Sequence, residues 1–352
     1  MTKKIADYEK YKKKSLMILI VLVLAWLGIG LFSLAAGSYN VPLTEILKAI
    51  VGKSEQANVN TIIYNLRLPR ILTAMIGGTG LGIVGCVLQA ILRNPLASSS
   101  TLGISQGASF GAAFAIIVLG AGVQGSAVSA VKFVNPFLIS FYAFLGSIAV
   151  SFLILALSRF KKISAEGMIL AGVALSAMFQ GATTLLQFFA NEVQLASVVF
   201  WAFGDLGRTG WREVIIMAVT VFVSGCYFMF SRWDYNALEV GEQTAISLGV
   251  NVNRVRIMNM LVCSITAAVI VSYLGIINFI GLVAPHIVRR FIGNNHVFLL
   301  PTSALMGGIL LLVGDYIARM AITPVILPIG AITSFMGAPL FLYLLFKSGQ
   351  RK

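Results

Sequence analysis

Long uncharged segments recur along the whole chain and are separated by short polar stretches. Most of these segments hold about 20 residues, and at about 1.5 Å per residue a helix of that length crosses the roughly 30 Å hydrocarbon core of a bilayer. The pattern predicts an all-α, polytopic membrane protein with about ten transmembrane helices. The expected spans are 15–36, 71–92, 102–119, 136–158, 167–190, 213–231, 257–277, 278–288, 297–318 and 325–346.

The segment 257–288 holds no Asp, Glu, Lys or Arg, yet it is too long for one span. A single helix over this segment would be about 48 Å long, well beyond the thickness of a bilayer core. Gly275, Asn278 and Gly281 offer a break, and Pro285 would kink the helix that follows. The sequence therefore predicts one ordinary span followed by a short one.

Composition supports a membrane protein and excludes several other classes. Of the 352 residues 58% are hydrophobic and only 11% are charged, and the mean hydropathy is +0.92. A soluble fold cannot cover that much apolar surface. The net charge of +14 does not indicate a nucleic-acid partner, because the basic residues lie in short loops between apolar segments. The three dispersed cysteines form neither a disulfide framework nor a metal-ligand spacing, and no metal or cofactor is expected.

The distribution of basic residues predicts the orientation in the membrane. If the N-terminus lies inside and ten spans alternate, 18 of the 26 Lys and Arg residues fall on the inner side. This bias follows the positive-inside rule and predicts that both termini are cytoplasmic, with 1–14 forming a basic cytoplasmic tail. The first apolar segment is longer than the usual 7–15 residue core of a signal peptide, so we expect it to be retained as a span.

The segment 66–107 is the richest in sequence signals. It reads LRLPRILTAMIGGTGLGIVGCVLQAILRNPLASSSTLGISQG, with arginines at both ends of a glycine-rich span. Gly78 and Gly82 have the small-xxx-small spacing that lets another helix approach closely. A lipid-facing anchor would gain nothing from so many glycines. The pattern therefore predicts a helix packed among others.

The ordered run RLPR…GG…LG..G..LQ...RNPLA…LGIS.GA in this segment resembles the permease subunits of iron–siderophore, haem and cobalamin ABC importers, the FecCD or BtuC-type family. The chain departs from the family pattern at Ser98-Ser99, where the family usually has an acidic residue or Ser and then Pro. The resemblance implies a BtuC-like type II importer fold, with 1–352 as one permease domain built from two related halves.

The same resemblance implies the location and the partners of the protein. It implies a bacterial cytoplasmic membrane, with lipid around the spans. It further implies a second permease subunit of the same or a related sequence, two cytoplasmic ATPase subunits and an extracytoplasmic substrate-binding protein. ATP hydrolysis would belong to the separate subunits, so the chain itself is not expected to be an enzyme.

A stripe of polar side chains runs along the expected fifth span. Its offsets of 0, 4, 7, 8 and 11 residues place it on one face of a helix. Such a stripe indicates either a water-filled pathway or hydrogen bonds to another helix. The resemblance favours a pathway, because this family lines its pathway partly with this helix. The residues of the stripe are Ser176, Gln180, Thr183, Thr184 and Gln187.

Only one expected inner loop is long, at 234–256. Asn236 and Glu239 have the spacing of a capping box, and Gly249 suits the position after a helix end, which predicts one helix of about 12 residues. The resemblance covers 237–250 and implies a coupling helix that fits a groove on the ATPase. The residues that match the family are Gly241, Glu242, Ala245, Leu248 and Gly249.

Three arginines lie on the expected outer side, against the positive-inside trend. Arg67 and Arg70 share a helix face, and Arg319 is expected as a third exposed cation, although Asp315 one turn earlier could hold it. The resemblance implies that they receive acidic residues of the substrate-binding protein. Lipid phosphate, or Glu45 and Glu55, are the alternative partners. Also outside, 41–51 predicts an amphipathic surface helix.

A second outer element is expected at 191–212, as a short helix and turn. It carries Trp201 and Trp211, which are expected as anchors at the membrane interface.

The resemblance therefore implies the permease subunit of an ATP-driven importer, with a ferric siderophore as substrate. Cobalamin or haem is the alternative cargo. A different class, an ion-coupled secondary transporter, would need ionisable residues at membrane depth to relay ions or protons. Asp315 is the one plausible acid of that kind, and it lies near the outer end of its span.

Overall fold

The computed structural model describes residues 2–36, 45, 46, 48, 57–122, 133–161 and 164–349. Within these ranges the regular elements are helices, joined by turns, and an isolated bridge links Ile322 and Val325. The elements are α1 (Thr2–Ala35), α3 (Ala57–Ile62), η1 (Ile63–Arg67), α4 (Leu68–Ile91), α5 (Ile104–Ile117), α6 (Pro136–Lys161), α7 (Ala165–Phe188), α8 (Glu192–Ala202), η2 (Leu206–Arg208), α9 (Trp211–Phe230), α10 (Arg232–Val240), α11 (Glu242–Ser247), α12 (Val252–Leu274), α13 (Ile280–Ile292), α14 (His296–Met320) and α15 (Ile329–Gly349).

Seven of these helices are long and apolar enough to cross a membrane. They include α1, α6, α7, α9, α12 and α14, together with the continuous helix Val59–Ile91 that contains α4. The remaining three expected spans correspond to the shorter helices α5, α13 and α15. The prediction of an all-α, multi-pass membrane protein is confirmed. The expected helix at 41–51 lies largely outside the described residues.

The N-terminal helix begins earlier than the apolar pattern indicates. Residues 1–14 were expected as a basic tail before the first span, but α1 is already helical from Thr2. The Lys, Glu and Ala residues of this segment are good helix formers, so the helix continues beyond the apolar part.

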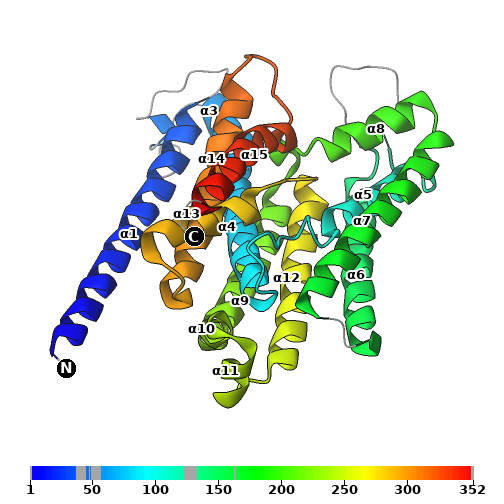
Figure 1. Ribbon diagram of the computed structural model, residues 1–352. Helices are drawn as coiled ribbons and strands as arrows, with labels where there is room; N and C mark the ends of the chain where they lie inside the picture. The colour runs from blue at the N-terminus through cyan, green and yellow to red at the C-terminus, as the bar shows by residue number, and fades with distance from the viewer. Residues whose placement is uncertain are drawn as a thin grey trace.

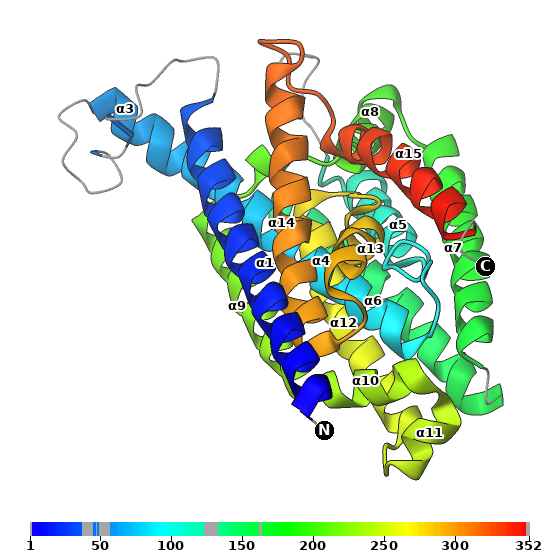
Figure 2. The ribbon, with the colours of Figure 1, turned by 60° about the vertical axis from the view of Figure 1, so that its left-hand side comes forward.

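Helix α4 occupies the centre of the bundle. It packs against α14, α13, α12 and α9, and nearly all of its side chains are buried. In Figure 1, α1 and α7 lie at opposite edges of the bundle. Figures 1 and 2 both place α10 and α11 at one end and α3 and α8 at the other. We refer to these as the predicted inner and outer sides.

Glycines allow the neighbouring helices to touch the backbone of α4. A Cβ atom on Gly78 would lie 2.8 Å from the Cα of Gly308 in α14, and Gly82 faces the same helix. One turn farther on, a Cβ atom on Gly85 would overlap the carbonyl oxygen of Gly281 in α13. The close approach predicted from Gly78 and Gly82 is therefore confirmed, with α14 as the partner helix.

The long apolar segment 257–288 is divided, as predicted. Helix α12 ends at Leu274 and α13 begins at Ile280. Gly275 has φ +80°, and Phe279, the residue before α13, has φ +65° in the left-handed region. A side chain on Gly275 would also contact the carbonyl oxygen of Trp201 at 2.6 Å. Glycine is therefore required at this break.

The two tryptophans of the outer element have different roles. Trp211 is partly exposed at the start of α9 and donates a hydrogen bond from its indole nitrogen to the carbonyl oxygen of Tyr64 at 3.0 Å. Trp201 is fully buried beside Gly275, where helix α12 ends. The expectation that Trp201 anchors the protein at the membrane interface is wrong, because the side chain fills the core instead.

The crossing of α4 and α13 gives a direct test of this packing. Replacing Gly85 by Ala should destabilise the protein by about 1–3 kcal/mol, because the added methyl group has to push two backbones apart. Gly28→Ala in α1 is the matched control, since nothing lies within 4 Å of its Cβ position. Thermal unfolding of the purified protein measures both variants. Equal unfolding temperatures for the two would show that α4 and α13 are not in backbone contact.

Candidate functional site

The polar stripe of α7 lies at the edge of the bundle, where the helix packs mainly on α5 (Figure 1). Thr183 is buried, whereas Gln180 and Thr184 are exposed. Ser176 and Gln187 are half-buried between these extremes. One side of the stripe therefore faces α5, and the other side is exposed on the surface of the described chain.

Hydrogen bonding within α7 accounts for the hydroxyl groups of the stripe. Ser176, Thr183 and Thr184 each donate to the backbone carbonyl oxygen four residues earlier, at 2.7, 2.8 and 3.0 Å. This is the usual way in which a helix satisfies Ser and Thr in an apolar surrounding. The opposite face of α7 carries the exposed apolar side chains of Met178 and Leu185. The exposed surface of the helix thus has one polar and one apolar flank.

A small polar cavity that the sequence did not predict lies between the segments that precede α5 and α13. It has a volume of about 240 Å³ and is lined by Ser98, Ser100, Thr101, Asn278, Phe279 and Leu282. The backbone nitrogen of Thr101 donates to the Ser98 hydroxyl at 3.2 Å, which closes a turn beneath it. A run of four hydroxyl residues at 98–101 was the only sequence signal for this site.

The long inner loop contains two helices rather than one. Gly241, with φ +150°, separates α10 from α11, and few other residues adopt that conformation. The prediction that Asn236 caps a single helix is wrong, because α10 begins at Arg232. Asn236 instead accepts a hydrogen bond from the backbone nitrogen of His296 at 2.8 Å. The predicted position of Gly249 after a helix end is confirmed, since it follows α11 with φ +84°.

Contacts with the bundle fix the position of both short helices. Glu242 at the start of α11 forms an ion pair with Arg256 of α12. The Nε atom of Arg256 also donates to the carbonyl oxygen of Ile91, the last residue of α4, at 3.3 Å. Ala245 is buried in the core, whereas Leu248 is 68% exposed. Of the residues expected to couple to an ATPase, Ala245 is therefore an anchor and Leu248 is accessible.

Helix α10 is held by the phenol of Tyr235, which lies outside the spans. Burial raises the pKa of this phenol well above its usual value. The hydroxyl therefore stays protonated and donates a hydrogen bond to the side-chain oxygen of Asn259 in α12. The neighbouring Leu238 is fully buried. These contacts fix the position of α10, and α11 follows it directly. The side chains of Ile246 and Leu248 in this region are exposed.

The arginines of the predicted outer side form a buried ionic cluster. The Nε atoms of Arg70 and Arg319 each donate to one carboxylate oxygen of Asp315, both at 2.8 Å. Asp315 has no exposed surface, and the Arg319 side chain is only 9% exposed. Arg67 is also buried and donates to the carbonyl oxygen of Leu34 at 2.8 Å. The expectation that Arg319 is an exposed cation is therefore wrong, and the alternative, that Asp315 one turn earlier holds it, is confirmed.

The cluster connects four parts of the chain. Arg319 in α14 also donates to the carbonyl oxygen of Ala36 at the end of α1, at 2.7 Å. A terminal nitrogen of Arg70 in α4 lies 3.6 Å from a carboxylate oxygen of Asp205, in the turn that follows α8. That carboxylate oxygen accepts from the backbone nitrogen of Gly207 at 2.9 Å, which orders the turn. The outer ends of α1, α4 and α14 and the turn after α8 are thus tied together.

Comparisons with known proteins agree along nearly the whole chain. The sequence profile of the FecCD transport family matches residues 20–347. The ABC transporter permease protein MJ0087 of Methanocaldococcus jannaschii is 48% identical over 344 residues, which are 98% of each chain. The hemin transport system permease protein HmuU of Yersinia pestis is 33% identical, covering 94% of this chain and 97% of that one.

A solved structure shares the fold as well as the sequence pattern. It is a metal-chelate type ABC transporter in an inward-facing conformation, with a TM-score of 0.81 and 29% sequence identity. The match covers 94% of this chain and 99% of that one. The similarity therefore extends to all of the helices that hold the stripe, the inner loop and the ionic cluster.

The ionic cluster predicts that neutralising Asp315 destabilises the protein much more than neutralising Glu45. Asp315→Asn should destabilise the protein by about 3–5 kcal/mol, because it leaves the buried guanidinium group of Arg319 without a charged partner and Arg70 with only the more distant Asp205. Glu45→Gln is the control, since Glu45 pairs with the exposed Lys48 and such pairs contribute about 0–1 kcal/mol. Thermal unfolding in detergent measures both. A shift for Asp315→Asn no larger than that for Glu45→Gln would contradict the cluster.

Proposed function

The chain belongs to the FecCD transport family of ABC permeases, and we propose that it carries a ferric siderophore into the cell as the membrane-spanning subunit of an ATP-driven importer. The observation that carries this proposal is the family match over almost every residue. The cargo named for the similar proteins, hemin for HmuU and a metal chelate for the solved transporter, supports a bulky iron complex. Haem and cobalamin are alternative cargoes of the same general size.

An ion-coupled secondary transporter is the weaker alternative. Such a transporter relays ions or protons through ionisable groups at membrane depth. The acid that this alternative needs is Asp315, and that carboxylate is already ion-paired with both Arg70 and Arg319. The inner loop, where Ile246 and Leu248 are exposed, would also lack a role. Both features support the ATP-driven importer.

The polar flank of α7 is the proposed lining of the pathway. Its exposed side chains face out of the single chain, so a second permease subunit, of the same or a related sequence, would close the pathway around them. Gln180, Thr184 and Gln187 supply polar groups to a solvated substrate, while Ser176 and Thr183 hold α7 on α5. Met178 and Leu185 on the other flank suit contact with lipid.

The inner loop is the proposed contact with the ATPase. The five residues expected to couple to the ATPase would have two different roles. Leu248 would contact the ATPase, while Gly241, Glu242, Ala245 and Gly249 hold α11 in position. ATP hydrolysis would take place on two separate cytoplasmic subunits, and the chain itself would not be an enzyme. This assignment places both termini in the cytoplasm and the protein in a bacterial cytoplasmic membrane.

The ionic cluster is the proposed docking region for an extracytoplasmic substrate-binding protein. Its three arginines outnumber its two carboxylates, Asp315 and Asp205, so an approaching carboxylate meets an excess of positive charge. Arg67 lies beside this cluster and donates to the carbonyl oxygen of Leu34. The burial of these arginines means that a partner would have to reach into the outer end of the bundle. The long-range attraction that brings an acidic partner to this region should depend on salt concentration.

The coupling role predicts the effect of a charge on α11. Leu248→Asp should weaken ATPase docking by tenfold or more, because a carboxylate would replace an exposed apolar contact at the centre of the interface. Substrate-stimulated ATP hydrolysis by the reconstituted complex is the measurement. Asn253→Asp adds the same charge at an exposed position outside α11 and should leave hydrolysis unchanged. Normal stimulation in Leu248→Asp would remove α11 from the interface.

The pathway role predicts which flank of α7 meets water. In a background with the exposed Cys226 replaced by Ser, single cysteines at Gln180 or Thr184 should react with water-soluble thiol reagents during turnover. Cysteines at Met178 or Leu185 should react at least tenfold more slowly, because lipid rather than water covers that flank. All four positions are exposed in the single chain, so burial does not decide the result. Equal rates on both flanks would contradict a pathway.

A further inference from the structure

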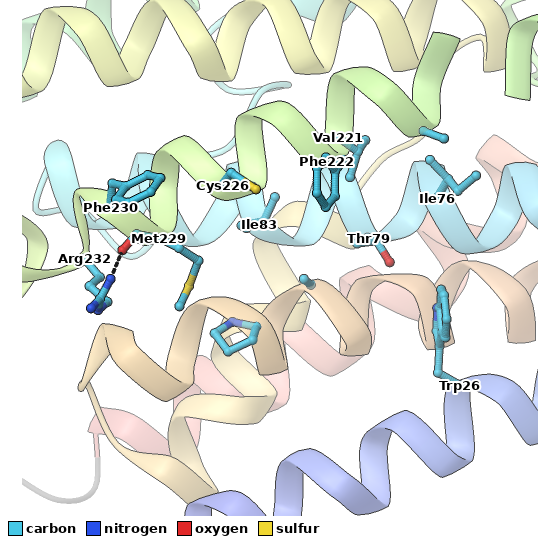
Figure 3. A pocket seen from close by; sticks show the side chains of 14 residues that line it. Trp26, Ile76, Thr79, Ile83, Val221, Phe222, Cys226, Met229, Phe230 and Arg232 are labelled. Atoms are coloured by element: carbon cyan, nitrogen blue, oxygen red, sulfur yellow. Dashed lines mark hydrogen bonds between the residues drawn. The ribbon is translucent and has the colours of Figure 1, made fainter. Parts of the chain in front are cut away.

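An apolar groove separates α1 from α9 on a side of the bundle away from the polar stripe. It has a volume of about 640 Å³ and its floor is formed by α4 and α14. Of the 14 residues that line it, only Thr79 and Arg232 carry a hydroxyl or a charge. Figure 3 shows Trp26 of α1 near one end, Phe222 and Cys226 of α9 along the groove, and Arg232 at the other end.

The dimensions of the groove match one leaflet of a bilayer. Its lining residues on α9 run from Ala218 to Phe230, a helical rise of about 18 Å. Half of the hydrocarbon core of a bilayer is about 15 Å thick. The groove therefore extends from one membrane surface to about the midplane, which is the depth that a single acyl chain occupies.

The end of the groove at the predicted inner side carries an available positive charge. Arg232 donates to the carbonyl oxygen of Met229 at 2.5 Å, and no carboxylate of the described residues forms an ion pair with it. Its remaining N–H groups are donors with a fixed geometry that suits phosphate. The neighbouring Trp233 is exposed, as is usual for tryptophan at the level of lipid head groups.

Lysines of α1 add to this charge. Tyr11 of α1 packs edge-on against Phe298 of α14, with ring centroids 5.9 Å apart, one turn before Pro301 of the groove floor. Lys10, Lys12, Lys13 and Lys14 surround Tyr11 in the sequence and therefore lie at the same depth as the inner end of the groove. An occupant should thus combine one apolar chain with an anionic group at its inner end.

We propose that this groove binds an anionic phospholipid of the cytoplasmic leaflet, with an acyl chain between α1 and α9 and the phosphate at Arg232. The phosphate accepts hydrogen bonds from the guanidinium group, and the lysines of α1 favour a head group with a net negative charge. The acyl chain of the bound lipid fills the groove between α1 and α9, which no side chain of the described residues fills. Only the choice of leaflet depends on the proposed orientation.

Fluorescence of Trp26 provides the test, because its indole lines the groove. The full-length protein is reconstituted in phosphatidylcholine vesicles that contain a small fraction of lipid with brominated acyl chains, and Trp26→Phe identifies the signal of Trp26. Each basic residue near a membrane surface contributes about 1 kcal/mol to the binding of anionic lipid, which is roughly fivefold. Brominated phosphatidylglycerol should therefore quench Trp26 at a fivefold lower fraction than brominated phosphatidylcholine.

Two pairs of variants separate the proposal from its alternatives. Arg232→Gln should reduce the preference for phosphatidylglycerol, with the lysines of α1 keeping the remainder, whereas Arg254→Gln, at an exposed position outside the groove on the predicted inner side, should leave it unchanged. Gly225→Phe should reduce quenching by both lipids, because its Cβ position opens into the groove with the nearest atom 4.0 Å away. Gly28→Phe should have no effect.

Three results would overturn the proposal. The first is equal quenching by the two lipids in the unmodified protein. The second is the same loss of preference in Arg232→Gln and Arg254→Gln. The third is a copurifying polypeptide that crosslinks to a photoreactive group at residue 225 while brominated lipid leaves Trp26 unquenched, since this would identify the occupant as a partner helix.

Discussion

Direct contact between helix backbones around α4 is the constraint on which the rest of the structure depends. Apolar side chains gain little by leaving lipid, so helices in a membrane associate through close packing and hydrogen bonds. Here α14 and α13 approach α4 so closely that Gly78, Gly82 and Gly85 leave no room for a side chain. These crossings set the positions of α13 and α14, and through them the ends of the bundle at both membrane surfaces.

The two ends of α4 connect it to both surfaces. At the outer end Arg70 contacts Asp315 of α14 and the turn after α8. At the inner end the carbonyl oxygen of Ile91 accepts from Arg256, which also holds Glu242 of α11. A helix whose middle cannot move relative to its neighbours thus joins the proposed docking region to the proposed ATPase contact. The groove between α1 and α9 lies beside this rigid unit, where packing is loose.

The sequence predicted the features that depend on local chemistry. Uninterrupted apolar segments gave the spans, and Gly275 within the segment 257–288 gave the break before α13.

Features that depend on distant contacts were missed. The burial of Arg70 and Arg319 around one carboxylate was missed, because Arg70 and Asp315 lie 245 residues apart in the chain. The split of the inner helix at Gly241 depends on a backbone angle that composition does not reveal. Trp201 was predicted to lie at the membrane interface. Its burial depends on packing beside Gly275, which is distant from it in the sequence. The roles of α7 and α11 remain predictions.

Uptake by reconstituted vesicles tests the central claim most directly. The chain is incorporated with its ATPase and substrate-binding protein, and a radiolabelled ferric siderophore is supplied on the side of the ionic cluster. The account predicts accumulation inside the vesicles that requires ATP on the side of α11 and that persists when ionophores remove all ion gradients. Accumulation that is driven by an ion gradient without ATP, or abolished by ionophores while ATP is present, would contradict it.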